Sequence, residues 1–296
     1  MKRSSLYLLI PVIFWGLSYI AIKIVLNELE PVEMISLRFL LASPALWLIL
    51  KYKKIDIFPL KNSGNLIVGA FLIFIHFWVM AVGMKETTAS NTAWILTTAP
   101  IFIAILGWLV LKERFTLWQS LGLLIAASGV IVLTANGSFD NLKWLNSRGD
   151  YIVLGSCITW AIYTIWVRKI RGIANPLLIT FWMTTFAGLI FVPYTFLTSD
   201  ISKFVSLQTD TIVSLLFLGL CCLAIAFWLW SEGLAKQNAT DVGIYLYVEP
   251  LITMVGAWVI LDERITVWLI LGAVLITIGV LISEKYGKTK IVEHDA

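Results

Sequence analysis

The chain has 296 residues, of which 59% are hydrophobic and 14% are charged, and its mean hydropathy is +0.90. A soluble domain has roughly 45–50% apolar and about 25% charged residues, so the composition excludes an ordinary soluble protein and predicts an integral membrane protein. The net charge of +4 does not indicate a nucleic-acid partner, because the basic residues lie mainly in short polar segments where membrane topology accounts for them.

Apolar stretches of about 20 residues, the length that spans a bilayer core about 30 Å thick, recur along the whole chain. They predict an all-α integral membrane protein, since a transmembrane β-barrel would show shorter, alternating segments. We expect ten transmembrane helices, at residues 6–26, 33–50, 64–84, 89–111, 117–135, 149–169, 177–197, 211–234, 239–261 and 266–284. The first lacks a small-residue cleavage site and is expected to remain in the mature protein.

The lysines and arginines between these stretches predict the orientation. Most of them, such as Lys51, Lys112 and Arg168, fall on the same side of the membrane as Lys2 and Arg3. Basic residues accumulate on the cytoplasmic side. We therefore expect both termini in the cytoplasm and the protein in the cytoplasmic (inner) membrane.

The second half of the sequence repeats the first. Residues 69–130 match 219–280 without a gap, and the earlier residues align in a slightly different register that pairs Trp15 with Trp160 and Pro31 with Pro176. The identical pairs that are not aliphatic include Phe77/Phe227, Trp78/Trp228, Gly83/Gly233, Pro100/Pro250, Trp108/Trp258, Glu113/Glu263, Arg114/Arg264, Thr116/Thr266, Trp118/Trp268, Gly122/Gly272 and Gly129/Gly279. They indicate an internal duplication.

Each copy holds five helices, an odd number, so the second copy must enter the membrane from the opposite side. We therefore predict two inverted five-helix repeats, at 1–136 and 149–286, with a linker at 137–148 and a cytoplasmic tail at 287–296. Inverted repeats are common in secondary transporters, which open a central site to one side and then to the other.

The sequence also resembles a known family, the drug/metabolite transporter superfamily, and within it the EamA-type ten-helix proteins. The resemblance covers nearly the whole chain. It rests on the Phe14-Trp15-Gly16 opening of the first helix and on the paired blocks Ala99-Pro100 to Leu111-Lys112-Glu113-Arg114 and Glu249-Pro250 to Leu261-Asp262-Glu263-Arg264. Characterised members export amino acids and other metabolites and have a central cavity between two bundles. The resemblance implies an exporter here and says little about its substrate.

Two titratable residues lie near the middle of predicted helices. An acidic residue such as Glu249 costs about 2.5–3.5 kcal/mol at the bilayer centre on insertion scales, so we expect it to face a cavity, where it contacts the solute or exchanges protons. The alternative is a carboxylate bonded at the backbone break that Pro250 makes. His76 is the second candidate for solute contact or proton coupling, or else a hydrogen-bonding link between helices. Met80 shares its helix face.

Several aromatic residues lie too deep for the aromatic belt at the membrane surface. Trp15 and Trp160 are repeat-related and central, and with Trp94, Trp230 and Tyr245 they are candidates for an aromatic lining that stacks on a planar group or holds a cation. Plain packing is the alternative for each of them.

Two polar residues complete the predicted substrate site. Arg38 suits the carboxylate of an amino acid or organic acid, unless it extends to the membrane interface. Asn91 lies in the fourth predicted helix and is polar enough to line a path. Pro100 and Pro250 are repeat-related prolines inside apolar spans, and we interpret them as candidate hinges.

Other functions find little support in the sequence. No GxxxxGK[ST] motif for ATP binding occurs, and no cluster has metal-ligand spacing, so we expect no cofactor, no metal and no enzymatic activity. We predict a secondary transporter, an exporter of small amino-acid-like or other amphipathic metabolites that works by alternating access. Its expected partners are the solute, membrane lipid and, as an open alternative, protons, in a monomer or weak homodimer. The alternatives are efflux of lipophilic cations or drugs, and a non-transporting accessory subunit or membrane enzyme.

Overall fold

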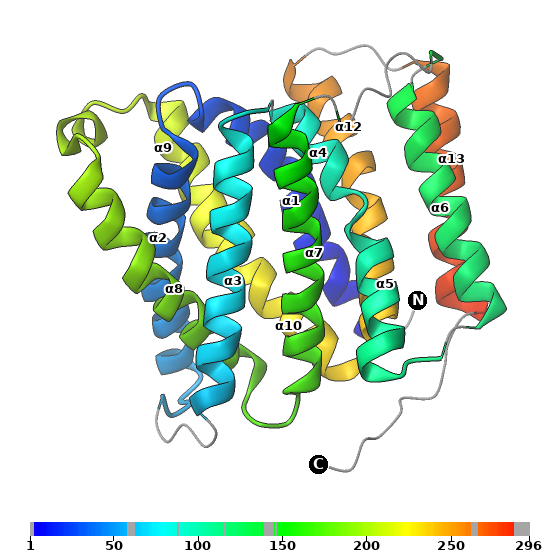
Figure 1. Ribbon diagram of the computed structural model, residues 1–296, viewed down its shortest axis with the longest axis horizontal. Helices are drawn as coiled ribbons and strands as arrows, with labels where there is room; N and C mark the ends of the chain where they lie inside the picture. Colours follow the sequence, from blue (N-terminus) through cyan, green and yellow to red (C-terminus); the bar gives the residue numbers. More distant parts are fainter. Residues whose placement is uncertain are drawn as a thin grey trace.

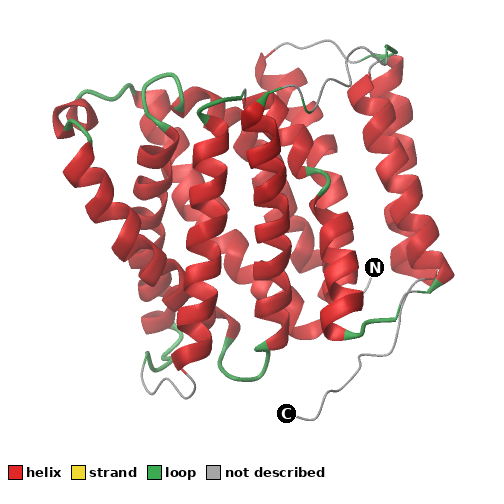
Figure 2. Ribbon diagram, viewed as in Figure 1, coloured by secondary structure: helices red, strands yellow, loops and turns green. Residues whose placement is uncertain are grey.

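The computed structural model describes residues 3–57, 63–87, 89–114, 116–135, 137–138, 145, 147–261 and 266–286. Within these ranges all regular secondary structure is helical (Figure 2), which confirms the all-α prediction. The linker is described only in small part, and the tail at 287–296 lies outside the described residues, as do Asp262, Glu263 and Arg264.

Seven long helices agree with the predicted spans to within about four residues. They are α1 (Arg3–Val25), α2 (Pro31–Tyr52), α3 (Ser63–Met84), α6 (Leu117–Ala135), α7 (Arg148–Lys169), α8 (Pro176–Thr198) and α13 (Val267–Tyr286). Local signals set several of their starts. Pro31 opens α2 behind a capping box of Glu30 and Glu33, and the side chain of Ser147 accepts from the amide of Asp150 at the start of α7.

The predicted helices at 89–111 and 239–261 are not continuous. The first consists of α4 (Ala89–Leu96) and α5 (Ala99–Leu111). The second consists of α11 (Ala239–Gly243), the 3-10 segment η4 (Ile244–Val248) and α12 (Glu249–Leu261). Pro100 and Pro250 are each the second residue of the helix that follows the break, in the first turn, where a proline is tolerated because its missing N–H would have no partner within the helix.

The predicted helix at 211–234 contains an irregularity that the sequence did not indicate. It begins as α9 (Thr209–Leu216), widens into the π-helix η3 (Phe217–Ile225) and ends as α10 (Ala226–Lys236). A short 3-10 turn, η2 (Ile201–Val205), precedes it. In the described part of the chain, nine helical stretches are long and apolar enough to cross a membrane, so the chain is a multi-pass membrane protein.

The helices stand side by side in one bundle (Figure 1). In that view the α1–α2 loop lies at the top and the α7–α8 turn at the bottom, and we call these the upper and lower ends. Helices α6 and α13 form a closely packed pair at one edge. A Cβ atom on Gly122 would lie 2.6 Å from the carbonyl oxygen of Gly279, and one on Gly272 would lie 2.7 Å from that of Gly129. Only glycine permits this backbone approach.

Candidate functional site

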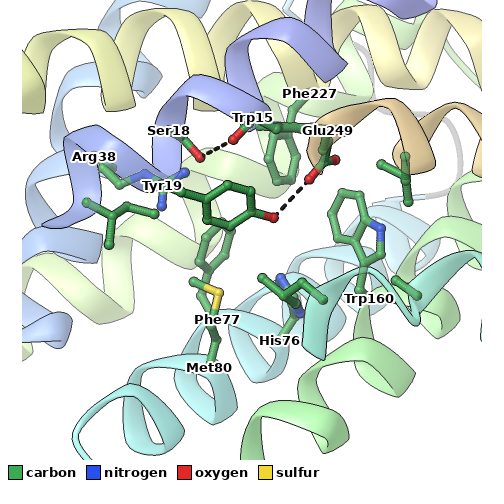
Figure 3. A pocket seen from close by; sticks show the side chains of 14 residues that line it. Trp15, Ser18, Tyr19, Arg38, His76, Phe77, Met80, Trp160, Phe227 and Glu249 are labelled. Carbon is green, nitrogen blue, oxygen red and sulfur yellow. Dashed lines mark hydrogen bonds between the residues drawn. The ribbon is translucent and has the colours of Figure 1, made fainter. Parts of the chain in front are cut away.

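A cavity of about 100 Å³ lies between α1, α2, α3, α7 and the two interrupted helices (Figure 3). By the same measure one water needs about 10–15 Å³, so the cavity has room for several waters or a small solute. Its lining residues are Trp15, Ser18, Tyr19, Ile22, Arg38, His76, Phe77, Met80, Leu96, Ala99, Trp160, Phe227, Leu246 and Glu249. The lining residues on α1 lie in its C-terminal half, towards the upper end of the bundle.

Glu249 is buried, with 8% of its surface exposed, and is the first residue of α12. The hydroxyl of Tyr19 donates a hydrogen bond of 2.9 Å to its Oε2 atom. The hydroxyl of Thr253 donates to the main-chain oxygens of both Glu249 and Gly16, which ties α12 to α1. The carboxylate is therefore held in place at the wall of the cavity, with one protein donor on its side chain in the described part of the chain.

Arg38 is buried with 4% exposure, and its Nε atom has no hydrogen-bond partner in the described part of the chain. Its guanidinium lies over the ring of Phe77, with 5.3 Å from Cζ to the centroid. Among the described residues no carboxylate lies within ion-pairing distance of it. An unpaired buried cation is costly, so this group is suited to an anion that enters the cavity. In Figure 3 Tyr19 lies between Arg38 and Glu249.

His76 lies on α3 with its Nδ1 atom 3.0 Å from the carbonyl oxygen of Ser156. A carbonyl can only accept, so we assign the proton to Nδ1, which leaves Nε2 as an acceptor. Met80, one turn further along α3, also lines the cavity. The side chain thus links two helices and lines the cavity at once, which combines the two interpretations drawn from the sequence.

Trp15 and Trp160 meet at the cavity wall with 5.6 Å between ring centroids and 90° between ring planes. The indole nitrogen of Trp15 donates to the carbonyl oxygen of Cys222, in the π-helical segment η3. Trp230, which is 1% exposed, packs on both indoles from the side away from the cavity. The two repeat-related tryptophans therefore form an aromatic wall, and Trp230 supports it from behind.

The structure brings six of the predicted substrate-site residues together around the cavity and leaves three outside it. Trp15, Arg38, His76, Met80, Trp160 and Glu249 line the cavity, whereas Trp94, Trp230 and Tyr245 do not. The side chain of Asn91 lies outside the described residues. Trp94 is half-buried at the end of α4, and Tyr245 is buried in η4.

Sequence reasoning missed Tyr19 and Phe227 in particular. Tyr19 lies four residues after Trp15, and a helix places positions i, i+3, i+4 and i+7 on one face. Since Trp15 was a candidate, that spacing predicts Ser18, Tyr19 and Ile22 as its neighbours on the wall. Phe227 matches Phe77 in the repeat, and the two rings stack at 6.0 Å.

The two helix interruptions lie at the cavity. Leu96 and Ala99 line it on either side of the break between α4 and α5, and Leu246 and Glu249 line it at the junction of η4 and α12. These are equivalent positions in the two copies. Each candidate hinge proline directly follows a lining residue, Ala99 or Glu249. The hydroxyls of Thr97 and Thr98 donate to the carbonyls of Trp94 and Ile95 at the break.

Comparison with known proteins gives a consistent picture. The sequence profile of the EamA-like transporter family matches residues 2–135 and 147–284. An "Uncharacterized transporter" of Archaeoglobus fulgidus is 25% identical, with 95% of this chain and 97% of that protein covered. A "Probable amino-acid metabolite efflux pump" of Escherichia coli is 26% identical, with 95% of each chain covered. A solved crystal structure with 15% identity superposes with a TM-score of 0.80 over 96% of each chain, which shows a shared fold.

Proposed function

Because the chain belongs to the EamA-like transporter family, we propose that it is a secondary transporter that exports small amino-acid-like or other amphipathic metabolites. One observation carries this proposal: Arg38 and Glu249, residues of opposite charge type, line the same buried cavity beside an aromatic wall. Polar groups at membrane depth mark solute pathways. The relatives named as amino-acid metabolite efflux pumps support the choice of solute class and direction.

The cavity chemistry suggests how such a solute binds. A carboxylate of the solute pairs with the guanidinium of Arg38, which has the geometry for two parallel hydrogen bonds. An ammonium group pairs with Glu249, and the remaining apolar part packs against Trp15 and Trp160. Each pairing compensates a protein group that is otherwise costly to bury.

The proposed architecture is ten membrane crossings in two inverted five-helix repeats, at 1–136 and 149–286. Contacts between repeat mates support it, since a twofold axis between two copies brings equivalent residues together. Trp15 contacts Trp160, and Phe77 contacts Phe227. The two glycine contacts between α6 and α13 are likewise reciprocal.

The proposed mechanism is alternating access, in which one repeat moves against the other around the cavity. The breaks next to Pro100 and Pro250 are the proposed hinges, because the backbone there lacks a continuous hydrogen-bond ladder. Glu249 and His76 remain the candidates for proton coupling. We place the protein in the cytoplasmic membrane with its lower end, where α1 begins and α13 ends, in the cytoplasm, as the basic residues predict.

A second candidate is efflux of lipophilic cations. The contact of Glu249 with the cavity beside Trp15 and Trp160 favours it, because an acid and indole faces together suit a cationic ring. The two candidate functions assign different roles to Arg38. A metabolite with a carboxylate pairs with the guanidinium, whereas a simple cation has no anionic group to do so.

The test begins with a comparison of metabolites inside and outside cells that do or do not produce the protein. Solutes that are depleted inside producing cells are then measured for flux in liposomes that contain wild-type protein, the Glu249→Gln variant, or the control Trp258→Phe on the exposed face of α12. We expect flux for wild type and the control and its loss in Glu249→Gln. Absence of flux above empty liposomes for amino acids, related metabolites and quaternary ammonium dyes would refute transport through this cavity.

A further inference from the structure

A buried ionic cluster lies at the lower end of the bundle, outside the cavity. Glu113 and Arg168 are 5% and 3% exposed, and Nε of the arginine lies 3.8 Å from Oε1 of the glutamate. The guanidinium also donates to the carbonyl oxygen of Leu234 at 3.0 Å and to the side-chain oxygen of Asn238 at 3.1 Å. We call Glu113, Arg168 and Asn238 the lower lock.

Glu113 holds the start of α11 as well. Its carboxylate accepts from the amides of Ala239 and Thr240, at 2.8 and 3.2 Å, and from the hydroxyl of Thr240 at 3.0 Å. An acidic group at a helix start satisfies amides that have no partner within the helix. The lock therefore joins the end of α5 to the end of α7 and to the α10–α11 turn.

The local sequence places the carboxylate there. Lys112 adopts a left-handed conformation with φ of 52° and ends α5, and the amide of Glu113 turns back to the carbonyl oxygen of Gly107 at 3.1 Å. A Cβ atom on Gly107 would lie 3.0 Å from Oε2 of Glu113. This tight turn places the carboxylate of Glu113 across the lower end of the bundle.

Buried polar atoms without partners lie at the cavity and between the cavity and the lower lock. Hydroxyl Oγ1 of Thr164, Nε1 of Trp230 and the hydroxyl of Tyr247 have no hydrogen-bond partner among the described residues. Thr164 lies one helical turn from the cavity residue Trp160 and one turn from Arg168, so all three share a face of α7. Trp230 lies one turn before Leu234, whose carbonyl the lock uses, and Tyr247 follows the lining residue Leu246.

Unsatisfied buried polar groups are rare in native proteins and call for an explanation. Three of them are grouped on α7, α10 and η4: Thr164 and Trp230 lie between the cavity and the lower lock, and Tyr247 lies at the level of the cavity. A path that is closed in this conformation and filled by water and solute in another would satisfy them in the second state.

We infer that the solute passes between the cavity and the lower end along α7, α10 and η4, and that the lower lock holds this path closed in the present conformation. Glu113 and Arg168 are then positioning residues, which control access without contacting the bound solute. This inference rests on the proposed transport function. Opening of the path can nevertheless be measured without any solute.

Cysteine accessibility tests the inference. Thr164→Cys is introduced, and its labelling rate by a charged, membrane-impermeant thiol reagent is measured in right-side-out and inside-out vesicles. The parent protein gives the baseline, since Cys157 and Cys222 are buried and Cys221 is half-buried. We expect slow labelling from one side only, and a rise of about tenfold when Glu113→Gln is added, since loss of one partner weakens a buried pair. Glu113→Asp should return the rate towards that of the single variant.

Two controls separate opening from damage. Thr185→Cys, at a half-buried residue on α8 whose hydroxyl is also buried without a partner among the described residues, should not respond to Glu113→Gln. Glu232→Gln, which breaks a partly exposed i,i+4 pair with Lys236, should not affect labelling of Thr164→Cys. If Glu113→Gln does not fold, Asn238→Ala removes the hydrogen bond that this side chain accepts from the Arg168 guanidinium. It should raise labelling about tenfold, since a hydrogen bond to a charged group contributes about 1.5–3 kcal/mol.

An unchanged labelling rate at Thr164→Cys in a folded lock variant would overturn the inference. An equal rise in the labelling rate of Thr185→Cys when Glu113→Gln is added would overturn it too. If instead labelling rises as expected but no solute is transported by any variant, the path opens as inferred and the proposed transport function fails. The two failures are therefore distinguishable.

Discussion

Trp15 and Trp160, which occupy equivalent positions in the two copies of the repeat, meet edge to face with their ring centroids 5.6 Å apart. The contact joins the first half of the chain to the second at the wall of the cavity. Each indole is thus both a packing element and part of the proposed solute-binding surface, so its substitution is expected to affect transport before it affects folding.

Trp160→Ala should lower the initial rate of transport about tenfold, because aromatic contacts contribute about 0.5–1.5 kcal/mol beyond burial and a large apolar surface is lost as well. Trp160→Phe should retain most of the rate. Initial rates in liposomes measure both. Equal transport rates for Trp160→Ala and wild type would show that the aromatic wall is not part of the proposed binding site.

Tyr19→Phe removes the hydroxyl that donates to Glu249 and leaves the ring. A hydrogen bond to a charged group contributes about 1.5–3 kcal/mol, so we expect solute affinity to fall about tenfold or more, with a smaller loss than in Glu249→Gln. Dissociation constants from solute-induced tryptophan fluorescence changes would show it. A wild-type dissociation constant for Tyr19→Phe would mean that solute binding at Glu249 does not require this hydrogen bond.

Arg38→Gln should discriminate between solutes by charge. For a solute with a carboxylate we expect a loss of about 30-fold or more, since truncating one member of a buried charge pair costs about 2–5 kcal/mol. Transport of the corresponding amine without a carboxylate should change little. The measurement compares an amino acid with its decarboxylated analogue, and equal losses for both would contradict the assignment of Arg38 to the carboxylate.

Gly272→Ala should destabilise the protein, because the added Cβ would lie 2.5 Å from Cβ of Leu133 and 2.7 Å from the carbonyl oxygen of Gly129. Overpacking of this kind costs about 1–3 kcal/mol. Thermal unfolding in detergent measures the effect. Gly64→Ala is the matched control, since no atom of the described residues lies within 4 Å of its added Cβ, and it should unfold at the wild-type temperature or slightly above.

The double variant Pro100→Ala, Pro250→Ala should lower the transport rate several-fold and leave solute affinity unchanged, because alanine restores two backbone donors and favours continuous helices by up to about 3 kcal/mol each. Pro193→Ala is the control, since Pro193 lies within the continuous helix α8. Rates equal to wild type would exclude the hinge role.

The sequence predicted the long helices well, because each is an apolar span of bilayer length bounded by charges or by a proline such as Pro31. Pro100 and Pro250 indicated candidate hinges, but not the form of the breaks before them, since a 3-10 turn and a two-residue gap follow from packing as well as from proline. The π-helical segment η3 has no signal in a run of apolar residues.

The candidate site was predicted in part, for a physical reason. Glu249, Arg38 and His76 are expensive to place in a membrane, so their presence alone indicated a cavity. Trp15 and Trp94 both lie deep in the membrane by their predicted positions, and only the arrangement of the helices places Trp15 on the cavity wall and Trp94 outside it. Tyr19 could have been found from its spacing to Trp15, whereas the contribution of Phe227 depends on the tertiary contact with Phe77.

Ala99 and Glu249 line the cavity from equivalent positions, one with a methyl group and the other with an acid. A frame of two matched copies would by itself make the inward-open and outward-open forms equal in free energy. Unlike side chains at matched positions remove that equality, because in the proposed cycle the solute keeps its acidic neighbour on the second copy. A preference of the protein for one form therefore comes from the positions at which the two copies differ.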